Sequence, residues 1–108
     1  HLYIEAPIPF DISVTGGSIK IPTLENNISL KIPANTQTGK IFRVKGKGAS
    51  IVRDRRRGDI LCRVIVETPS NLTKKQLETL NNFKESLDNE KNYPGSNTFS
   101  KAISKLNK

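Results

Sequence analysis

Apolar and polar residues alternate along the first two-thirds of the chain. In residues 2–8, LYIEAPI, every second position is apolar. The alternation continues in four later segments, which are residues 18–24, 27–33, 40–45 and 59–68. A period of two places apolar side chains on one face of a β-strand and polar side chains on the other. The pattern therefore predicts five short strands in residues 1–69, in a small, mainly β domain of sandwich or barrel-like form.

The same alternation predicts which side chains form the core. The inward-facing residues are expected to be Leu2, Ile4, Ala6 and Ile8, then Ile19 and Ile21, then Ile28, Leu30 and Ile32, and finally Ile60, Cys62, Val64 and Val66. Cys62 is the one cysteine of the chain, so no disulfide can form within it. We expect its thiol to be a small, buried hydrophobe that reacts slowly with thiol reagents.

Three connections carry local signals. The segment FDISVTGG predicts about one helical turn, with Asp11 as its N-cap and Gly16–Gly17 as its stop. A hairpin turn is expected at residues 25–27, because Asn tolerates the left-handed conformation. The glycine-rich stretch GKIFRVKGKG has neither the glycine spacing nor the Ser or Thr of a phosphate-binding loop. We therefore interpret it as a strand whose exit turn uses Gly46 and Gly48.

After Pro69 the apolar period changes from two to between three and four residues, which predicts a helix over residues 70–89. Thr73 and Gln76 have the spacing of a capping box, and Leu72 can pack on Leu77 as a hydrophobic staple. The helix has a narrow apolar stripe formed by Leu77, Leu80, Phe83 and Leu87. Such a stripe suits a dimer interface, and the alternative is that the helix packs on its own sheet. Residues 90–108 are expected to be a linker and a short amphipathic tail containing Phe99, Ala102, Ile103 and Leu106.

The chain is basic, with a formal net charge of +8. This charge makes a nucleic-acid-binding β-domain of the ribosomal-protein type the alternative function. However, the six aromatic residues do not form a ladder with basic residues that could stack on bases. We therefore expect the arginine-rich run, Arg53, Arg55, Arg56 and Arg57, to be a solvated loop, with no nucleic-acid partner.

The sequence offers no candidate catalytic, cofactor-binding or metal-binding residues. The one histidine is His1, so a serine or cysteine nucleophile has no partner base within the fold. Asp54 and Asp59 lie beside arginines, which favour the ionised carboxylate rather than a raised catalytic pKa. The sequence therefore predicts a protein that is not an enzyme. Without a signal peptide or an apolar run of membrane-spanning length, we expect a cytoplasmic protein with no membrane partner.

Six segments, taken in order, resemble the DnaJ class of J-domain co-chaperones. They are LYIEAPIPF, the short helix closed by GG, IKIPTL, LKIPANTQTGKIFRVKGKG, RGDILCRVIVETP and NLTKKQLETL. The resemblance covers about residues 2–88 and is most specific in IPANTQTGKIFRVKGKG. It implies that residues 1–69 are the second C-terminal β-domain of such a protein and that residues 70–89 are its dimerisation helix.

The resemblance also implies a function for the chain. We expect a homodimer formed through Leu77, Leu80, Phe83 and Leu87, within a parent that presents unfolded client proteins to a DnaK-type chaperone during protein folding and the stress response. The His-Pro-Asp motif of the J-domain and the zinc-binding cysteine repeats of the family are absent from this sequence. We therefore expect a C-terminal fragment that binds no cofactor, while a parent with the cysteine repeats would bind zinc.

Overall fold

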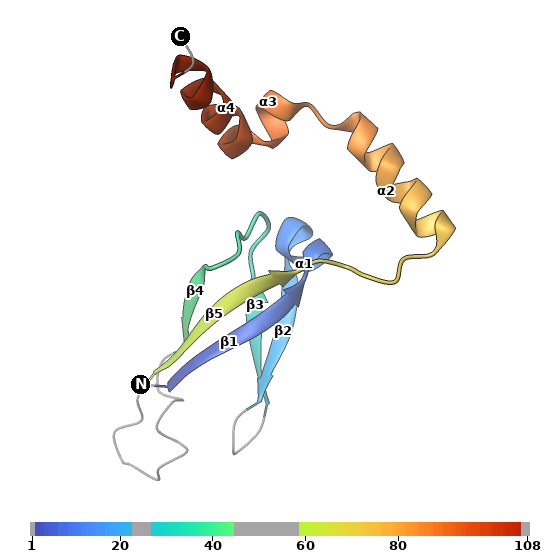
Figure 1. The fold of residues 1–108 in the computed structure, drawn as a ribbon. Coiled ribbons are helices and arrows are strands. Elements are labelled where there is room, and N and C mark those ends of the chain that lie inside the picture. The colour runs from blue at the N-terminus through green and yellow to red at the C-terminus, as the bar shows by residue number, and fades with distance from the viewer. Residues whose placement is uncertain (1, 23–26, 45–58, 107–108) are drawn as a thin grey trace. The chain divides into compact units, whose positions relative to one another are not determined.

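The computed structural model describes residues 2–22, 27–44 and 59–106 (Figure 1). In chain order, the elements are β1 (Leu2–Pro9), α1 (Phe10–Thr15), β2 (Gly17–Pro22), β3 (Asn27–Ile32), β4 (Ile41–Val44), β5 (Ile60–Glu67), α2 (Lys74–Ser86), α3 (Asn89–Asn92) and α4 (Pro94–Leu106). The chain divides into two compact units, His1–Ser70 and Asn71–Lys108. The first unit contains all the described strands, and the second contains only helices.

Two sheets make up the first unit. The larger has the strand order β1-β5-β4, and the smaller is the hairpin of β2 and β3. β1 and β5 are parallel, in a register that runs from Leu2 opposite Ile60 to Pro9 opposite Glu67. β4 is antiparallel to β5, and β2 is antiparallel to β3. The prediction of a small, mainly β domain followed by a C-terminal helix is confirmed, and neither sheet of the described strands closes into a barrel.

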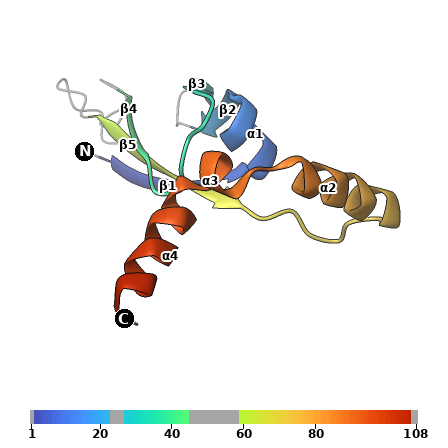
Figure 2. The ribbon, with the colours of Figure 1, turned by 90° about the horizontal axis from the view of Figure 1, so that it is seen from above.

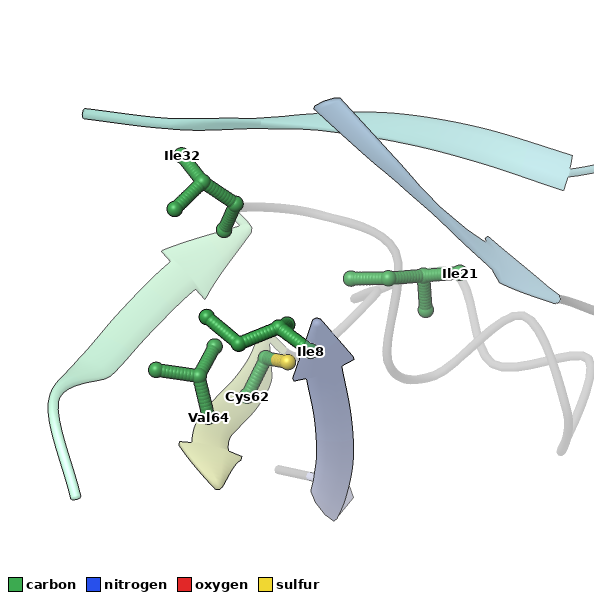
Figure 3. Close-up of a cluster of buried hydrophobic side chains, with 5 residues drawn as sticks. All are labelled: Ile8, Ile21, Ile32, Cys62 and Val64. Atoms are coloured by element: carbon green, nitrogen blue, oxygen red, sulfur yellow. The ribbon is translucent and has the colours of Figure 1, made fainter. Parts of the chain in front are cut away.

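The core lies between the two sheets. Ile8, Ile21, Ile32, Cys62 and Val64 form one cluster in which no residue is more than 2% exposed. Figure 3 shows these side chains converging from strands of both sheets. Burying an Ile or Val side chain contributes about 1.5–3 kcal/mol, so this cluster is a main source of the domain's stability. The residues packed around it are Ile4, Ala6, Ile12, Ile19, Leu30, Phe42 and Val66.

This burial confirms the predicted inward faces of the strands. Along β1 the even-numbered residues are more buried than their neighbours, and the buried residues of β5 are Ile60, Cys62 and Val64. On the outer face of the same sheet, Arg63 lies opposite Glu5, with 3.9 Å between the guanidinium and the carboxylate, and both side chains are exposed. The two-residue period therefore separated core from solvent correctly in both strands.

β1 lies at an edge of the larger sheet and contains two prolines. The N–H of Leu2 donates to the carbonyl of Asp59 at 2.9 Å, so the backbone groups of alternate residues starting at Leu2 point toward β5. Pro7 and Pro9 belong to the other set, whose backbone groups point away from β5. Proline has no N–H, and it is therefore accommodated at these positions of an edge strand without loss of a bond within the sheet.

Helix α1 connects β1 to β2 and, with the hairpin, lies on one side of the larger sheet (Figure 2). Its predicted N-cap is wrong. The helix begins at Phe10, its N-cap is Pro9 with φ −59°, and no side chain caps it. Asp11 lies inside the first turn, where a carboxylate still interacts favourably with the helix dipole. The strand therefore passes directly into the helix through a proline.

The predicted stop of α1 at Gly16 is confirmed. Gly16 has φ +85°, and its N–H donates to the carbonyl of Ile12 at 2.8 Å. A Cβ at this position would lie 3.0 Å from the backbone nitrogen of Ala34 and 3.1 Å from the carbonyl oxygen of Ile32. Conformation and close approach therefore both require glycine here.

The segment after β3 is bound to the end of α1. The N–H of Asn35 donates to the carbonyl of Val14 at 3.1 Å, and the N–H of Thr36 donates to the carbonyl of Ser13 at 2.8 Å. The Thr36 hydroxyl donates to the carbonyl of Pro33 at 2.6 Å, which closes the turn. Ser13 and Thr36 are the buried polar residues of the described ranges. The Ser13 hydroxyl donates to the carbonyl of Phe10 at 2.6 Å, so both hydroxyl groups have a partner.

Three expectations concern residues outside the described part of the chain. Two of the three residues of the expected hairpin turn, 25 and 26, lie outside the described residues, and the third, Asn27, begins β3. The exit turn with Gly46 and Gly48 lies in residues 45–58, as does the run of Arg53, Arg55, Arg56 and Arg57. These expectations stay predictions.

We expect Gly16→Ala to destabilise the first unit by about 1–3 kcal/mol. A positive φ is unfavourable for Ala, and its Cβ would lie too close to the backbone at the end of β3 and just after it. Urea denaturation followed by circular dichroism measures the change. Gly95→Ala is the matched control, since a Cβ there meets no atom within 4 Å. An unchanged unfolding midpoint for Gly16→Ala would contradict the assigned role of this glycine.

We also expect Cys62 to react with a thiol reagent much more slowly in the native protein than in the denatured chain. The residue is 0% exposed, and burial raises the pKa of its thiol, which lowers the thiolate fraction at neutral pH. The reaction with an aromatic disulfide, followed by absorbance with and without denaturant, measures this. Equal rates would show that Cys62 faces solvent.

Candidate interaction surfaces on the C-terminal helices

Helix α2 begins with a capping box. The N–H of Gln76 donates to the Thr73 hydroxyl oxygen at 3.1 Å, and the N–H of Thr73 donates to Oε1 of Gln76 at 2.8 Å. The predicted capping box is therefore confirmed. Such a cap stabilises a helix by about 1 kcal/mol and fixes where α2 starts.

The described structure leaves the apolar stripe of α2 exposed. Leu77, Leu80 and Phe83 are between 41% and 47% exposed, and no residue of α2 is buried. A spacing of three residues places them along one side of the helix. An isolated helix of 13 residues is only marginally stable in water, and most helices in proteins depend on packing of their apolar face. The stripe of α2 therefore needs a partner surface.

The fourth predicted member of the stripe lies just beyond the helix. α2 ends at Ser86, and Leu87 is its C-cap, with an extended backbone. The cause is Asp88, whose carboxylate accepts hydrogen bonds from the N–H groups of Glu90 at 2.9 Å and Lys91 at 3.3 Å. Asp88 is thus the N-cap of a new short helix, α3. Leu87 is half-buried next to the stripe, and its part in an interface stays a prediction.

The last helix starts earlier than expected. Residues 90–108 are expected to begin with a linker, but α3 continues to Asn92 and α4 begins at Pro94, so only Tyr93 separates the two helices. Proline is well suited to the first position of a helix, because its φ is helical and no N–H is needed there. The N–H of Asn97 donates to the carbonyl of Tyr93 at 3.1 Å, which completes the first turn.

α4 has a second exposed apolar face. Phe99 is 67% exposed, Ile103 is 41% exposed and Leu106 is 79% exposed. Spacings of four and three residues place these side chains on one side of the helix. Lys101 and Lys105 are the charged residues of α4 and follow the apolar positions by two residues, so they lie on the opposite side. α4 is therefore amphipathic, as expected for the tail.

Two kinds of feature were not found in the described ranges, a cluster of metal-ligating side chains and a membrane-spanning helix. No group of three or more His, Cys, Asp or Glu residues comes together within the ranges that the structure describes. None of the helices in these ranges has both the length and the apolar character needed to cross a bilayer.

Asp59 forms an ion pair with Arg43 of β4.

One hollow of about 420 Å³ lies where β1 and β5 end. It is lined by Pro9, Phe10, Asp11, Glu67, Thr68, Pro69 and Ser70. Its charged lining residues are the carboxylates Asp11 and Glu67, and sequence analysis did not single it out. The parallel register that places Pro9 opposite Glu67 brings these two segments together. Pairing across so many residues has no local signal in the sequence.

Comparison with known protein families identifies the first unit. The family model described as the DnaJ C terminal domain matches residues 1–69, which is more than half of the chain and includes β1 to β5. The DnaJ C terminal domain is a domain of chaperone cofactors and is not a catalytic family. The match agrees with the resemblance carried by the strands and by the IPANTQTGKIFRVKGKG segment. The chain therefore belongs to the DnaJ family of co-chaperones and contains its C-terminal domain in residues 1–69.

Proposed function

We propose that this chain is the dimerisation and client-presentation module of a DnaJ-class co-chaperone that delivers unfolded proteins to a DnaK-type chaperone. The observation that carries the proposal is the exposed stripe of Leu77, Leu80 and Phe83 on a helix that directly follows a DnaJ C-terminal domain. The proposed interface is formed by these three residues and Leu87. The free, buried thiol of Cys62 suits the reducing cytoplasm, where we place the protein.

The energetics of α2 support association with a second copy. A symmetric dimer has a two-fold axis, so each residue of the stripe contributes to the interface once from each copy. Complete burial of an exposed Leu or Phe contributes about 1.5–3 kcal/mol, and side chains that are already half-buried gain about half of that. Six such side chains offset the lower part of the range of about 4–15 kcal/mol that association costs. Burial of the stripe therefore favours association of two copies, and the surfaces beside it would have to add to the affinity.

Dimerisation would give the parent protein two arms. Each arm would carry its own β-domain, and an extended client could contact both at once. The second contact is then intramolecular, and such linkage can raise the overall affinity by about 10²–10⁴ without any new type of contact. This gain is the functional reason that we propose for a dimerisation helix at this place in the chain.

Salt dependence distinguishes the co-chaperone function from nucleic-acid binding. Both described arginines of the larger sheet face carboxylates, Arg43 with Asp59 and Arg63 with Glu5. Phosphate binding would require free basic groups and would weaken steeply with salt. An apolar dimer would not show that salt dependence, so ionic strength separates the two functions.

The double variant Leu80→Asp, Phe83→Asp should be a folded monomer. The two carboxylates would have to be desolvated in the interface, while the β-domain, whose core lies elsewhere, should stay intact. Size-exclusion chromatography with light scattering measures the mass, and circular dichroism measures the fold. Thr79→Asp with Asn82→Asp is the matched control, because it adds the same charge at the same spacing beside the stripe and should remain dimeric.

Two results would overturn the α2 interface. One is a double variant that stays dimeric at the wild-type dissociation constant. The other is a wild-type protein that is monomeric at high concentration together with a double variant that unfolds. That second result would mean that the stripe of α2 packs on its own domain.

We expect the wild-type dimer to bind an unfolded protein at least about tenfold more tightly than the Leu80→Asp, Phe83→Asp monomer, because two linked β-domains act together. Reduced, carboxymethylated α-lactalbumin is a suitable probe, with binding followed by fluorescence anisotropy. The Thr79→Asp, Asn82→Asp control should bind like the wild type. Equal affinity of dimer and monomer would refute the two-armed mechanism while leaving the dimer itself in place.

A further inference from the structure

We propose that the hollow at the ends of β1 and β5 is a docking site for an arginine side chain of a partner polypeptide. In this site the guanidinium group stacks on the ring of Phe10 and pairs with the carboxylates of Asp11 and Glu67. The occupant we assign is an exposed, extended segment that carries arginine beside an apolar residue. All residues of the hollow belong to the first unit, so the inference does not depend on dimerisation through α2.

The backbone around the hollow is held in place by the fold of the first unit. Pro9 and Glu67 are the last pair in the parallel register of β1 and β5, and α1 begins at the next residue, Phe10. Backbone hydrogen bonds tie the other end of α1 to the segment after β3. The proline rings also fix φ at Pro9 and Pro69. A preformed site loses little conformational entropy on binding, which favours affinity even for a short segment.

Part of the lining is apolar and is not used by the core. Phe10 is 40% exposed, and it belongs neither to the core cluster nor to the residues packed around that cluster. Pro9 and Pro69 line the same hollow. Its volume of about 420 Å³ is near the lower end of the range of about 300–1,000 Å³ for ligand pockets, which suits one long side chain. An exposed aromatic ring with rigid apolar neighbours is a favourable surface for the stem of such a side chain.

The charge of the lining selects a cation. Among the residues that the structure describes, the carboxylates of Asp11 and Glu67 have no cationic partner. The cross-strand neighbour of Glu67 is Pro9, and α1 contains no basic residue. Earlier along the same strands, by contrast, Glu5 lies opposite Arg63. In a chain with a net charge of +8, these two uncompensated carboxylates favour a basic occupant by charge complementarity.

The combination of an aromatic ring with carboxylates suits arginine better than lysine. A guanidinium group is planar, so it can stack on the ring of Phe10 while its N–H groups donate to carboxylate oxygens at its edge. The ammonium group of lysine is a compact, strongly hydrated charge without a face for stacking. The apolar surfaces of Pro9 and Pro69 leave contact area for a residue next to the arginine, which a free cation would not use.

The test is a titration of the full 108-residue, ¹⁵N-enriched chain with the capped peptide Gly-Leu-Arg-Leu-Gly, followed by amide chemical shifts. The expected result is saturable shifts of the amide signals that line the hollow, those of Phe10, Asp11, Glu67, Thr68 and Ser70. The control peptide carries citrulline in place of arginine, which keeps the shape and removes the charge. It should bind at least about fivefold more weakly, because charge-assisted hydrogen bonds are stronger than neutral ones.

A matched pair of variants tests the two carboxylates. Asp11→Asn with Glu67→Gln should weaken binding of the arginine peptide at least about fivefold and leave binding of the citrulline peptide unchanged. Glu78→Gln with Glu85→Gln removes the same charge from α2 and should stay within about twofold of the wild type. Phe10→Leu keeps an apolar side chain but removes the ring face, and it should weaken the arginine peptide more than the citrulline peptide. Circular dichroism should show an unchanged fold in all three variants.

Four results would overturn the inference. They are the absence of shifts at the hollow with millimolar peptide, equal binding of the citrulline peptide, equal weakening by the two double carboxylate variants, and the same shifts with spermidine at the same concentration. The last result would make the hollow a general cation site. The Leu80→Asp, Phe83→Asp variant should bind the arginine peptide like the wild type, and a lower affinity there would contradict a site formed by the first unit alone. A wild-type chain that is monomeric and still binds the peptide would refute the α2 interface and support the arginine site.

Discussion

The parallel pairing of β1 with β5 is the contact on which the rest of the domain depends. It joins residues 2–9 to residues 60–67, the first and last strands of the first unit. Once they are paired, Ile8, Cys62 and Val64 form one wall of the core, and the hairpin of β2 and β3 closes it from the other side. β4 joins the larger sheet only through β5. Loss of this pairing would therefore remove both the wall and the support of the third strand.

The inward faces of the strands could be predicted because burial follows a period of two, which each strand carries in its own residues. The start of α2 could be predicted for a similar reason, since Thr73 and Gln76 lie three residues apart and cap the helix locally. The parallel register of β1 and β5 could not, because no short-range signal connects residues separated by more than fifty positions. The end of α2 was misplaced because Asp88 was not recognised as a cap, and its side chain favours a new helix over continuation of the old one.

The proposed interaction surface on the C-terminal helices divides in the same way. The spacing of apolar residues along the sequence predicts that both C-terminal helices are amphipathic. The exposed area of these residues is known only from the structure. That area decides how much a single helix can contribute. In this family member, the domain with the larger core and the helices with the larger exposed surface are separate units of the chain. Such a division suits a protein in which one part folds by itself and another part folds fully only with its partner.

The two prolines of β1 have a consequence for a protein that works among unfolded chains. An open sheet edge invites a passing extended segment to add itself as another strand, and repeated addition leads to fibrils. Along the second half of β1, Pro7 and Pro9 have outward-facing carbonyls but no N–H groups. An added strand would therefore find no donors for its own carbonyls there. The domain can therefore meet aggregation-prone polypeptides at high concentration without this part of its edge seeding their growth.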